Sequence, residues 1–300
     1  MKLTRRDFLK VFGASAAMLG VGARIAPPAL APASRSAPIT SSDQIGLLID
    51  TTRCIGCKRC VVACQQAHNL PVNPNVMHLS PEALSFIDAK NISADPAKPV
   101  IKTVNRQCMH CQHPGCASAC TVGALQKLPN GPVVYDSDKC IGCRYCMYAC
   151  PFGVPTFEWS KQLSLIAKCD SCANLVKEGQ PTACSKACPV NAIQFGKRTE
   201  LLTMAHQRIA DSKGSYVNHV YGETEAGGTT RLYLAAVPFA DLGFPQLPDL
   251  SAAETSEEIM HATPIIAGTM ATVLTALYFI TRRFGGTSDE QAEEIHSGEK

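Results

Sequence analysis

The stretch that decides the fold is CIGCRYCMYACP, residues 140–151, which places four cysteines at the spacing C-x2-C-x2-C-x3-C and closes with a proline. The same cysteine spacing occurs in CIGCKRCVVAC, residues 54–64. All sixteen cysteines of the chain fall into four compact groups of four, of which these are two. The groups are Cys54, Cys57, Cys60 and Cys64; Cys108, Cys111, Cys116 and Cys120; Cys140, Cys143, Cys146 and Cys150; and Cys169, Cys172, Cys184 and Cys188.

This spacing is the one by which bacterial ferredoxins hold cubane iron–sulfur clusters. A tight loop supplies three thiolates to one cluster, and the fourth cysteine serves a neighbouring cluster. We expect that fourth cysteine at the start of a following helix, where it points away from its own loop. The four groups therefore predict metal sites for four [4Fe-4S] clusters.

Two other uses of the cysteines fit the spacing less well. Structural zinc pairs two C-x2-C knuckles and has no use for a third and fourth cysteine at this pitch. Disulfides suit an exported chain, but cysteines three residues apart are poorly placed to reach distant partners. A chain of this length also needs no stapling.

The cysteine groups are part of a longer internal repeat. TTRCIGCKRCVVAC (51–64) resembles SDKCIGCRYCMYAC (137–150), and ACTVGALQ (119–126) resembles ACPVNAIQ (187–194). The order predicts an α+β fold, a duplicated bacterial ferredoxin-like (dicluster) domain over residues 34–200. After the last cysteine of each unit we expect a short helix and then a strand, as in GPVVYD (131–136) or AIQFG (192–196).

The N-terminus predicts an export signal. TRRDFLK, residues 4–10, matches a twin-arginine motif, a mildly apolar run follows, and Ala31-Pro32-Ala33 offers a cleavage site. Residues 1–33 are therefore expected to be a signal peptide for export of the folded protein. An N-terminal anchor is the alternative, although an apolar run broken by glycines is short for a membrane span.

A second apolar segment lies near the C-terminus. Residues 262–281 carry no charge and have the length of a single transmembrane helix. Glutamates precede the segment and Arg282 and Arg283 follow it, so residues 282–300 are predicted to be a cytoplasmic tail, with the cluster domain on the periplasmic side of the inner membrane. Gly268, Thr269, Thr272 and Thr275 suit packing against another membrane helix. A buried globular helix is the alternative.

Residues 201–261 are expected to form an extension that packs on the cluster domain. They contain no catalytic constellation, and YGETEAGGTTRLYL (221–234) reads as a glycine-containing turn into a strand. The net charge of +3 argues against a nucleic-acid partner.

Histidines and basic residues surround the cysteine groups. His110 and His113 lie inside the second group, where we expect surface hydrogen bonding. Basic side chains border the loops and can raise cluster potentials. They are Arg53, Lys58, Arg59, Lys139, Arg144 and Lys168.

Five segments carry a resemblance to the periplasmic iron–sulfur subunits of the four-cluster ferredoxin superfamily, which includes formate dehydrogenase beta and molybdopterin oxidoreductase subunits. They are QCMHCQHPGC (107–116), CIGCRYCMYACPFGVP (140–155), KCDSC (168–172), YGETEAGGT (221–229) and LPDLS (247–251). The resemblance covers about residues 1–285. The chain is most similar to the HybA type, linked to hydrogenase-2, because it carries its own twin-arginine motif.

The resemblance implies how the cysteines are shared. Each cluster would take three thiolates from one group and the fourth from another. The implied sets are Cys54, Cys57, Cys60 with Cys188; Cys169, Cys172, Cys184 with Cys64; Cys108, Cys111, Cys116 with Cys150; and Cys140, Cys143, Cys146 with Cys120.

The resemblance also implies a non-catalytic electron-transfer subunit. Its partners would be the small and large subunits of a [NiFe] hydrogenase and an integral membrane subunit that reduces quinone. The alternatives are the beta subunit of formate dehydrogenase or of another molybdopterin enzyme, and a free-standing periplasmic ferredoxin.

Overall fold

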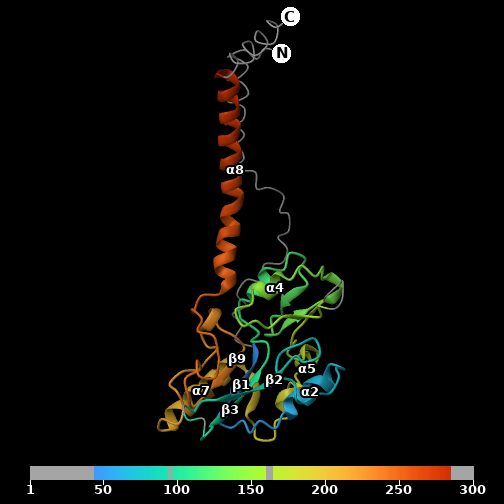
Figure 1. Cartoon of the computed structure of the whole chain (residues 1–300), viewed down its shortest axis with the longest axis vertical. Coiled ribbons are helices and arrows are strands. Elements are labelled where there is room, and N and C mark those ends of the chain that lie inside the picture. The colour runs from blue at the N-terminus through green and yellow to red at the C-terminus, as the bar shows by residue number, and fades with distance from the viewer. Residues whose placement is uncertain (1–43, 94, 96, 160–164, 285–300) are drawn as a thin grey trace, which may run out of the picture. The chain divides into compact units, whose positions relative to one another are not determined.

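The computed structural model of the chain describes residues 44–93, 95, 97–159 and 165–284. The predicted signal peptide, residues 1–33, and residues 285–300 of the predicted tail lie outside the described residues. Helices and short strands alternate along the described chain (Figure 1). In chain order the elements are β1 (Ile45–Asp50), α2 (Arg59–Ala67), β2 (Phe86–Asn91), β3 (Ile101–Arg106), α3 (Gly115–Ser118), β4 (Leu125–Lys127), β5 (Val133–Tyr135), η1 (Ser137–Lys139), α4 (Tyr145–Tyr148), β6 (Thr156–Phe157), β7 (Ile166–Ala167), α5 (Ala173–Lys177), α6 (Ala183–Lys186), β8 (Ile193–Lys197), α7 (Arg198–Asp211), η2 (Glu225–Gly227), β9 (Arg231–Leu234) and α8 (Ala252–Phe284).

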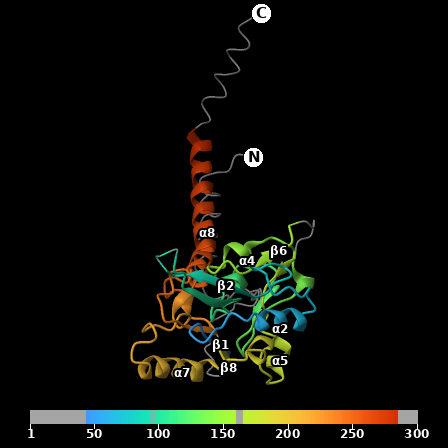
Figure 2. The ribbon, with the colours of Figure 1, turned by 60° about the horizontal axis from the view of Figure 1, so that its bottom comes forward.

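A three-stranded sheet of order β8-β1-β9 joins the beginning of the described chain to its later part. β1 pairs antiparallel with β8 and parallel with β9. Its apolar side chains alternate between the two faces of the sheet. Leu47 and Ile49 enter one core, and Leu48 enters a second core with Leu201 and Ala205 of α7. Figure 2 shows α7 beneath β1 and β8.

The cysteine-bearing helices form two nested units. α2 of the first cysteine group packs on α6 of the fourth, and β1 pairs with β8. We call these segments the outer unit. α3 of the second group packs on α4 of the third, and β4 pairs with β5, which makes the inner unit. The inner unit lies in the sequence between the two halves of the outer unit.

Part of the expected local structure is confirmed. GPVVYD and AIQFG contain β5 and β8, and YGETEAGGTTRLYL contains the turn η2 followed by β9. The expected helix position was wrong in three groups: the short helix begins one residue before the third cysteine and contains it, and the fourth cysteine follows the end of the helix. The helices are α3, α4 and α6. Among the fourth cysteines of the groups, only Cys64 lies within a helix, because α2 continues to Ala67.

The extension after β8 packs on the cluster-bearing core. β9 is the second neighbour of β1, and its four side chains are all buried. Tyr221, Tyr233, Phe239 and Phe244 stack in one aromatic core with ring centroids 4.6–5.4 Å apart. Position 200, where we placed the end of the cluster domain, lies inside α7, and the domain limits stay predictions.

α8 is 33 residues long and begins on the inner unit. A side chain at Gly115 of α3 would lie 2.8 Å from the Ala149 carbonyl oxygen and 3.4 Å from Cβ of Ala252, so glycine allows α3, α4 and α8 to meet. His113 is ion-paired with Glu257 at 3.2 Å, and the Ser118 hydroxyl donates to the same carboxylate at 2.8 Å. The first turns of α8 are thus fixed to the inner unit by packing and charge.

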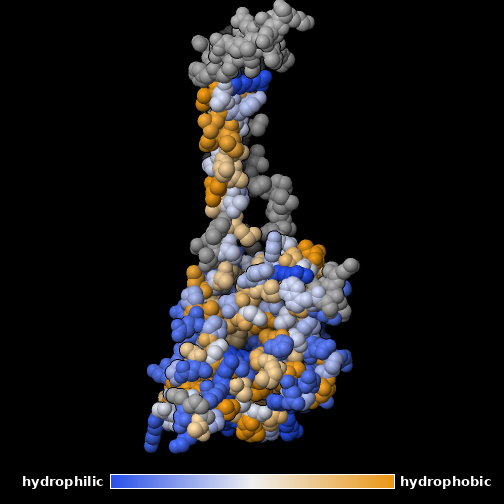
Figure 3. Space-filling view, viewed as in Figure 1, coloured by the Kyte–Doolittle hydropathy of each residue, from blue (hydrophilic) through white to orange (hydrophobic). Residues whose placement is uncertain are grey.

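The rest of α8 is apolar and exposed. By length and composition, Ala262–Arg282 can cross a membrane, and its most apolar window has no buried share among the described residues. Figure 3 shows these apolar side chains along the helix surface. The hydroxyls of Thr269, Thr272 and Thr275 donate to carbonyls one turn earlier in the same helix, at 3.0, 2.8 and 2.7 Å. These threonines therefore leave no unpaired hydroxyl donor on the helix surface.

Candidate metal centres

The two C-I-G-C loops owe their shape to residues with positive φ. Gly56 and Gly142 have φ of 67° and 69°, and Lys58 and Arg144 have φ of 60° and 66°. Such values are unusual for side chains other than glycine. Two left-handed residues in each loop turn the chain around a centre, so that the cysteines on either side face inward.

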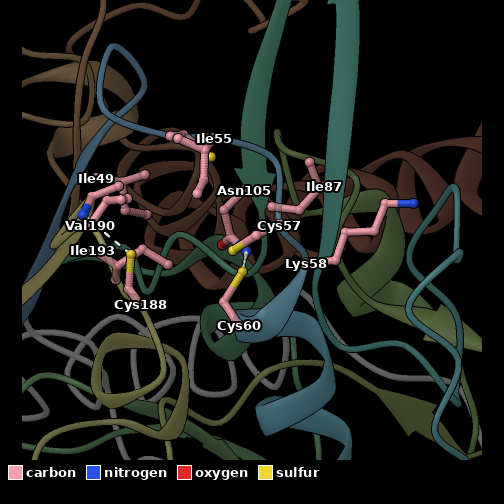
Figure 4. A pocket seen from close by; sticks show the side chains of 12 residues that line it. Ile49, Ile55, Cys57, Lys58, Cys60, Ile87, Asn105, Cys188, Val190 and Ile193 are labelled. Atoms are coloured by element: carbon pink, nitrogen blue, oxygen red, sulfur yellow. Dashed lines mark hydrogen bonds between the residues drawn. The ribbon is translucent and has the colours of Figure 1, made fainter.

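Four cysteines from both halves of the outer unit line one pocket. They are Cys54, Cys57, Cys60 and Cys188. In Figure 4, Cys57 and Cys60 lie on one side of the pocket and Cys188 on the other, while the Lys58 side chain points away. The Asn105 amide donates to Sγ of Cys60 at 3.4 Å. Burial, followed by nearby thiols, raises the pKa of Cys60 to about 12.

The other thiols fall into three further quartets by the charge interactions between them. Burial raises the pKa of Cys64, Cys111 and Cys146, and neighbouring thiols of the same quartet raise it further. The pKa of Cys146 rises to about 11. The quartets are Cys64 with Cys169, Cys172 and Cys184; Cys111 with Cys108, Cys116 and Cys150; and Cys146 with Cys120, Cys140 and Cys143. These groupings are consistent with the four sets that the resemblance implies, and the assignment of each cysteine to a cluster stays a prediction.

Buried thiols that share a pocket would repel one another as thiolates, and the structure supplies donors that favour the thiolate form. The fourth cysteine of three groups accepts a hydrogen bond from the backbone N–H four residues later. These bonds join Ala124 to Cys120 at 3.2 Å, Val154 to Cys150 at 3.5 Å and Ala192 to Cys188 at 3.2 Å. N–H donors to sulfur are among the features that tune iron–sulfur clusters. The donor set fits [4Fe-4S] clusters.

The closing proline is not needed for this arrangement. Cys150 and Cys188 precede prolines, whereas Cys120 precedes Thr121, yet all three accept the same N–H bond. Cys64 departs from the pattern because α2 continues through it. Its Sγ lies 3.9 Å from Nδ1 of His68, at the end of the helix.

The quartets follow one another in a series. Cys184 of the second quartet is among the thiols that raise the pKa of Cys60 in the first. Cys64 and Cys169 share a core cluster with Cys108, and Cys116 shares another with Cys146. Cys57 and Cys143 are the two exposed cysteines. They belong to the first and last quartets, so an exposed cysteine lies at each end of the series.

Both histidines of the second group were expected at the surface, and this expectation was wrong. His110 is fully buried, and its Nδ1 accepts a hydrogen bond from the Val133 N–H at 2.8 Å. Burial holds the pKa of His110 well below its usual value. His113 is 4% exposed and contacts the first turns of α8.

An ion pair beside the second quartet was not foreseen. His68 Nε2 lies 2.8 Å from Asp170, and His68 Nδ1 lies 2.8 Å from the Cys64 carbonyl oxygen. The hydrogen bond to Asp170 raises the pKa of His68. The pair joins α2 to the loop of the fourth group across a sequence separation that no local pattern reveals.

Comparison with known proteins also indicates iron–sulfur domains. Residues 53–124 and 100–198 each match a family described as 4Fe-4S dicluster domain. A protein of Nitratidesulfovibrio vulgaris is 38% identical, over 98% of this chain and 81% of the relative. The hydrogenase-2 operon protein HybA of Escherichia coli O157:H7 is 35% identical, over 94% of this chain and 95% of the relative. The iron–sulfur subunit of nitrate-inducible formate dehydrogenase of Escherichia coli K12 is 35% identical, over 69% and 74%.

Proposed function

Because the chain belongs to the family of 4Fe-4S dicluster iron–sulfur subunits that includes HybA and the formate dehydrogenase subunits, we propose that it passes electrons from a periplasmic [NiFe] hydrogenase to a quinone-reducing membrane partner. The family establishes an iron–sulfur electron-transfer subunit with [4Fe-4S] clusters. A [4Fe-4S] cluster takes up and releases single electrons. The four-cluster count and the partners are the proposed part.

The serial order of the quartets carries this proposal. Four sets of thiols lie in a row, and a thiol is exposed only at each end. Such a row suits transfer through the protein between two surfaces. All sixteen cysteines are used, so each quartet has the ligands of a complete cubane.

The two ends of the row suit different partners. The quartet with Cys143 belongs to the inner unit, whose α3 and α4 meet the start of α8 at Gly115. The quartet with Cys57 belongs to the outer unit. We propose that electrons enter at Cys57 and leave at Cys143, beside the segment that would anchor the subunit in the membrane.

α8 supports attachment to the membrane and docking on a membrane partner. Its apolar surface is exposed, and a side chain at Gly268 would meet nothing within 4 Å. Because Thr269, Thr272 and Thr275 satisfy their hydroxyls within the helix, the face with Gly268 can approach another helix closely. We propose a single span with a cytoplasmic C-terminus.

Formate dehydrogenase is the second candidate source of electrons, since its iron–sulfur subunits are also relatives. Affinity purification of the chain from solubilised membranes separates the two. Hydrogenase subunits in the complex support the proposal, and formate dehydrogenase subunits contradict its electron source but not its electron transfer.

Metal analysis tests the cluster count. Four quartets at four irons each predict sixteen irons per chain after anaerobic purification, with little zinc. Iron near half that number, or zinc in its place, would contradict four cubanes. Acid-labile sulfide measured on the same sample gives an independent count.

Export is tested at the twin arginines. Replacement of Arg5 and Arg6 by lysine keeps the charge and removes the guanidinium pair that the export receptor reads. We expect the protein to remain in the cytoplasm with its clusters assembled. Fractionation that finds normal periplasmic levels would reject this route.

A further inference from the structure

Three cationic side chains are buried in the middle of the molecule. Arg231 is 1% exposed, and Lys127 and Lys168 are each 7% exposed. They come from distant parts of the sequence: β4 of the inner unit, the residue before Cys169, and β9 of the extension. Burial of a charge without a partner of opposite charge is strongly unfavourable, so each of these side chains requires an explanation.

Lys127 reaches only carbonyl oxygens. Its Nζ donates to the His110 oxygen at 3.2 Å and to the Gly131 oxygen at 2.6 Å. The same His110 oxygen accepts from the Thr230 N–H at 3.2 Å, which ties β9 to the second cysteine group. Burial lowers the pKa of Lys127 to about 7, while the nearby thiols Cys111 and Cys108 act in the opposite direction.

Lys168 and Arg231 also donate to neutral oxygens. Lys168 Nζ lies 2.5 Å from the Val133 oxygen and 2.7 Å from the Cys169 oxygen. Arg231 Nη2 donates to the Ser171 hydroxyl at 2.6 Å, and its Nε has no partner among the described residues. In that part of the chain, the ion pairs to carboxylates involve none of the three cations.

The groups of opposite charge are the thiolates of the two middle quartets. Hydrogen bonds place two of the cations against the cysteine loops: the His110 oxygen that accepts from Lys127 directly precedes Cys111, and Lys168 donates to the oxygen of Cys169 itself. Val133, whose oxygen also accepts from Lys168, lies in one core cluster with Cys116, and Ser171, whose hydroxyl accepts from Arg231, donates its N–H to Sγ of Cys169 at 3.3 Å. Cys111 and Cys116 belong to the third quartet and Cys169 to the second.

We propose that Lys127, Lys168 and Arg231 are internal counter-charges that raise the reduction potentials of the two middle clusters. The inference rests on the proposed function, because it takes each quartet to hold a cluster. Reduction adds negative charge, so a protonated cationic side chain nearby stabilises the reduced form, and the effect is strong where water is excluded.

The basic residues at the two ends lack these conditions. Lys139 precedes Cys140 as Lys168 precedes Cys169, but its side chain is 52% exposed and is ion-paired with Asp136 at 2.8 Å. Lys58 beside Cys57 is hydrogen-bonded to Asn75 at an exposed site. Solvent and these partners screen both charges.

Lys168 and Lys139 therefore form a matched pair for the experiment. The anaerobically purified full-length protein is titrated redox-potentiometrically with EPR detection, as wild type, Lys168→Met, Lys168→Gln and Lys139→Met. We expect the midpoint potential of one cluster to fall in both Lys168 variants and to remain unchanged in Lys139→Met. Glutamine keeps a hydrogen-bond donor, so a shift with methionine alone would assign the effect to lost hydrogen bonds and overturn the proposal.

Two further variants locate the effect. Lys127→Met should lower the potential of the cluster that responds to Lys168, and Arg231→Met should lower that of a different cluster. Iron content is measured on every sample. Wild-type potentials in the iron-replete Lys168 variants would overturn this inference, whereas a wild-type protein without iron–sulfur signals would overturn the proposed function instead. Should Arg231→Met fail to accumulate, the two lysines decide the result.

Discussion

The loop CIGCKRC, residues 54–60, and the loop CIGCRYC, residues 140–146, have the same cysteine spacing and the same backbone course. Both place a glycine and a basic residue in the left-handed region, and both expose their second cysteine. Ile55 and Ile141, at equivalent positions, are 64% and 59% exposed. Their surroundings differ.

The chain after the first loop turns back into the protein, whereas the chain after the second stays at the surface. α2 runs for nine residues and buries Val61 and Gln65. α4 lasts four residues, and its Tyr145 and Tyr148 are 58% and 83% exposed. Arg144 stacks over the exposed ring of Trp159, with its guanidinium carbon 4.3 Å from the ring centroid.

The comparison separates two roles within one motif. The cysteines, the glycine and the basic residue with positive φ determine the shape of the cysteine loop, so both loops have them. The remaining positions determine what each end presents, which is a short apolar tip at one end and an aromatic surface at the other. Tyrosine and tryptophan are enriched at interfaces with proteins and membranes, so the second end has the composition of a docking surface.

Of the changes proposed here, loss of α8 should have the largest effect, because it removes the membrane attachment beside the Cys143 end of the series and not beside the Cys57 end. Truncation before Ala262 should release a folded protein that dyes still reduce, while hydrogen-dependent quinone reduction by membranes falls to background. A polyleucine segment in place of residues 262–281 should restore membrane attachment but leave quinone reduction impaired, since it lacks the close-approach face of Gly268. Full recovery with polyleucine would show that α8 acts only as an anchor.

The exposed cysteines at the two ends should give opposite phenotypes. Cys57→Ser should slow reduction of all the clusters by hydrogen, because electrons enter there. Cys143→Ser should leave that reduction intact, give a three-iron or altered cubane EPR signal, and block transfer to quinone. Stopped-flow absorbance with hydrogenase measures the first step and quinol formation the second. Equal effects of both variants on the first step would contradict the direction of flow.

Alanine substitution of one glycine in each unit should have a smaller effect, which is a difference in the free energy of unfolding. Gly56 and Gly123 have φ of 67° and 65°, but a side chain at Gly56 would lie 3.0 Å from Cγ2 of Thr103, while one at Gly123 meets nothing within 4 Å. Gly123→Ala should cost roughly 1–2 kcal/mol for the left-handed backbone, and Gly56→Ala roughly 2–4 kcal/mol because crowding is added. Anaerobic denaturation followed by cluster absorbance compares them, and equal midpoints would contradict the role of Thr103.

Sequence reasoning reached the features that local spacing encodes. The groups of cysteines, the strands after them and the apolar C-terminal helix are each visible within a short window. The short helices were displaced because a C-x3-C segment is just long enough for one turn, which leaves the fourth cysteine beyond its end. The burial of His110 and Arg231 depends on β9 pairing with β1, nearly two hundred residues away, and no local pattern records that pairing.

The nested order of the two units has a consequence for biosynthesis. The inner unit is continuous along the chain, so its eight cysteines are all translated before the fourth group; they are Cys108, Cys111, Cys116, Cys120, Cys140, Cys143, Cys146 and Cys150. The outer unit cannot close until β8 reaches β1, and β1 gains its last neighbour only when β9 emerges. The inner unit can therefore close before the outer unit, and β9 is the last strand of the three-stranded sheet to be translated.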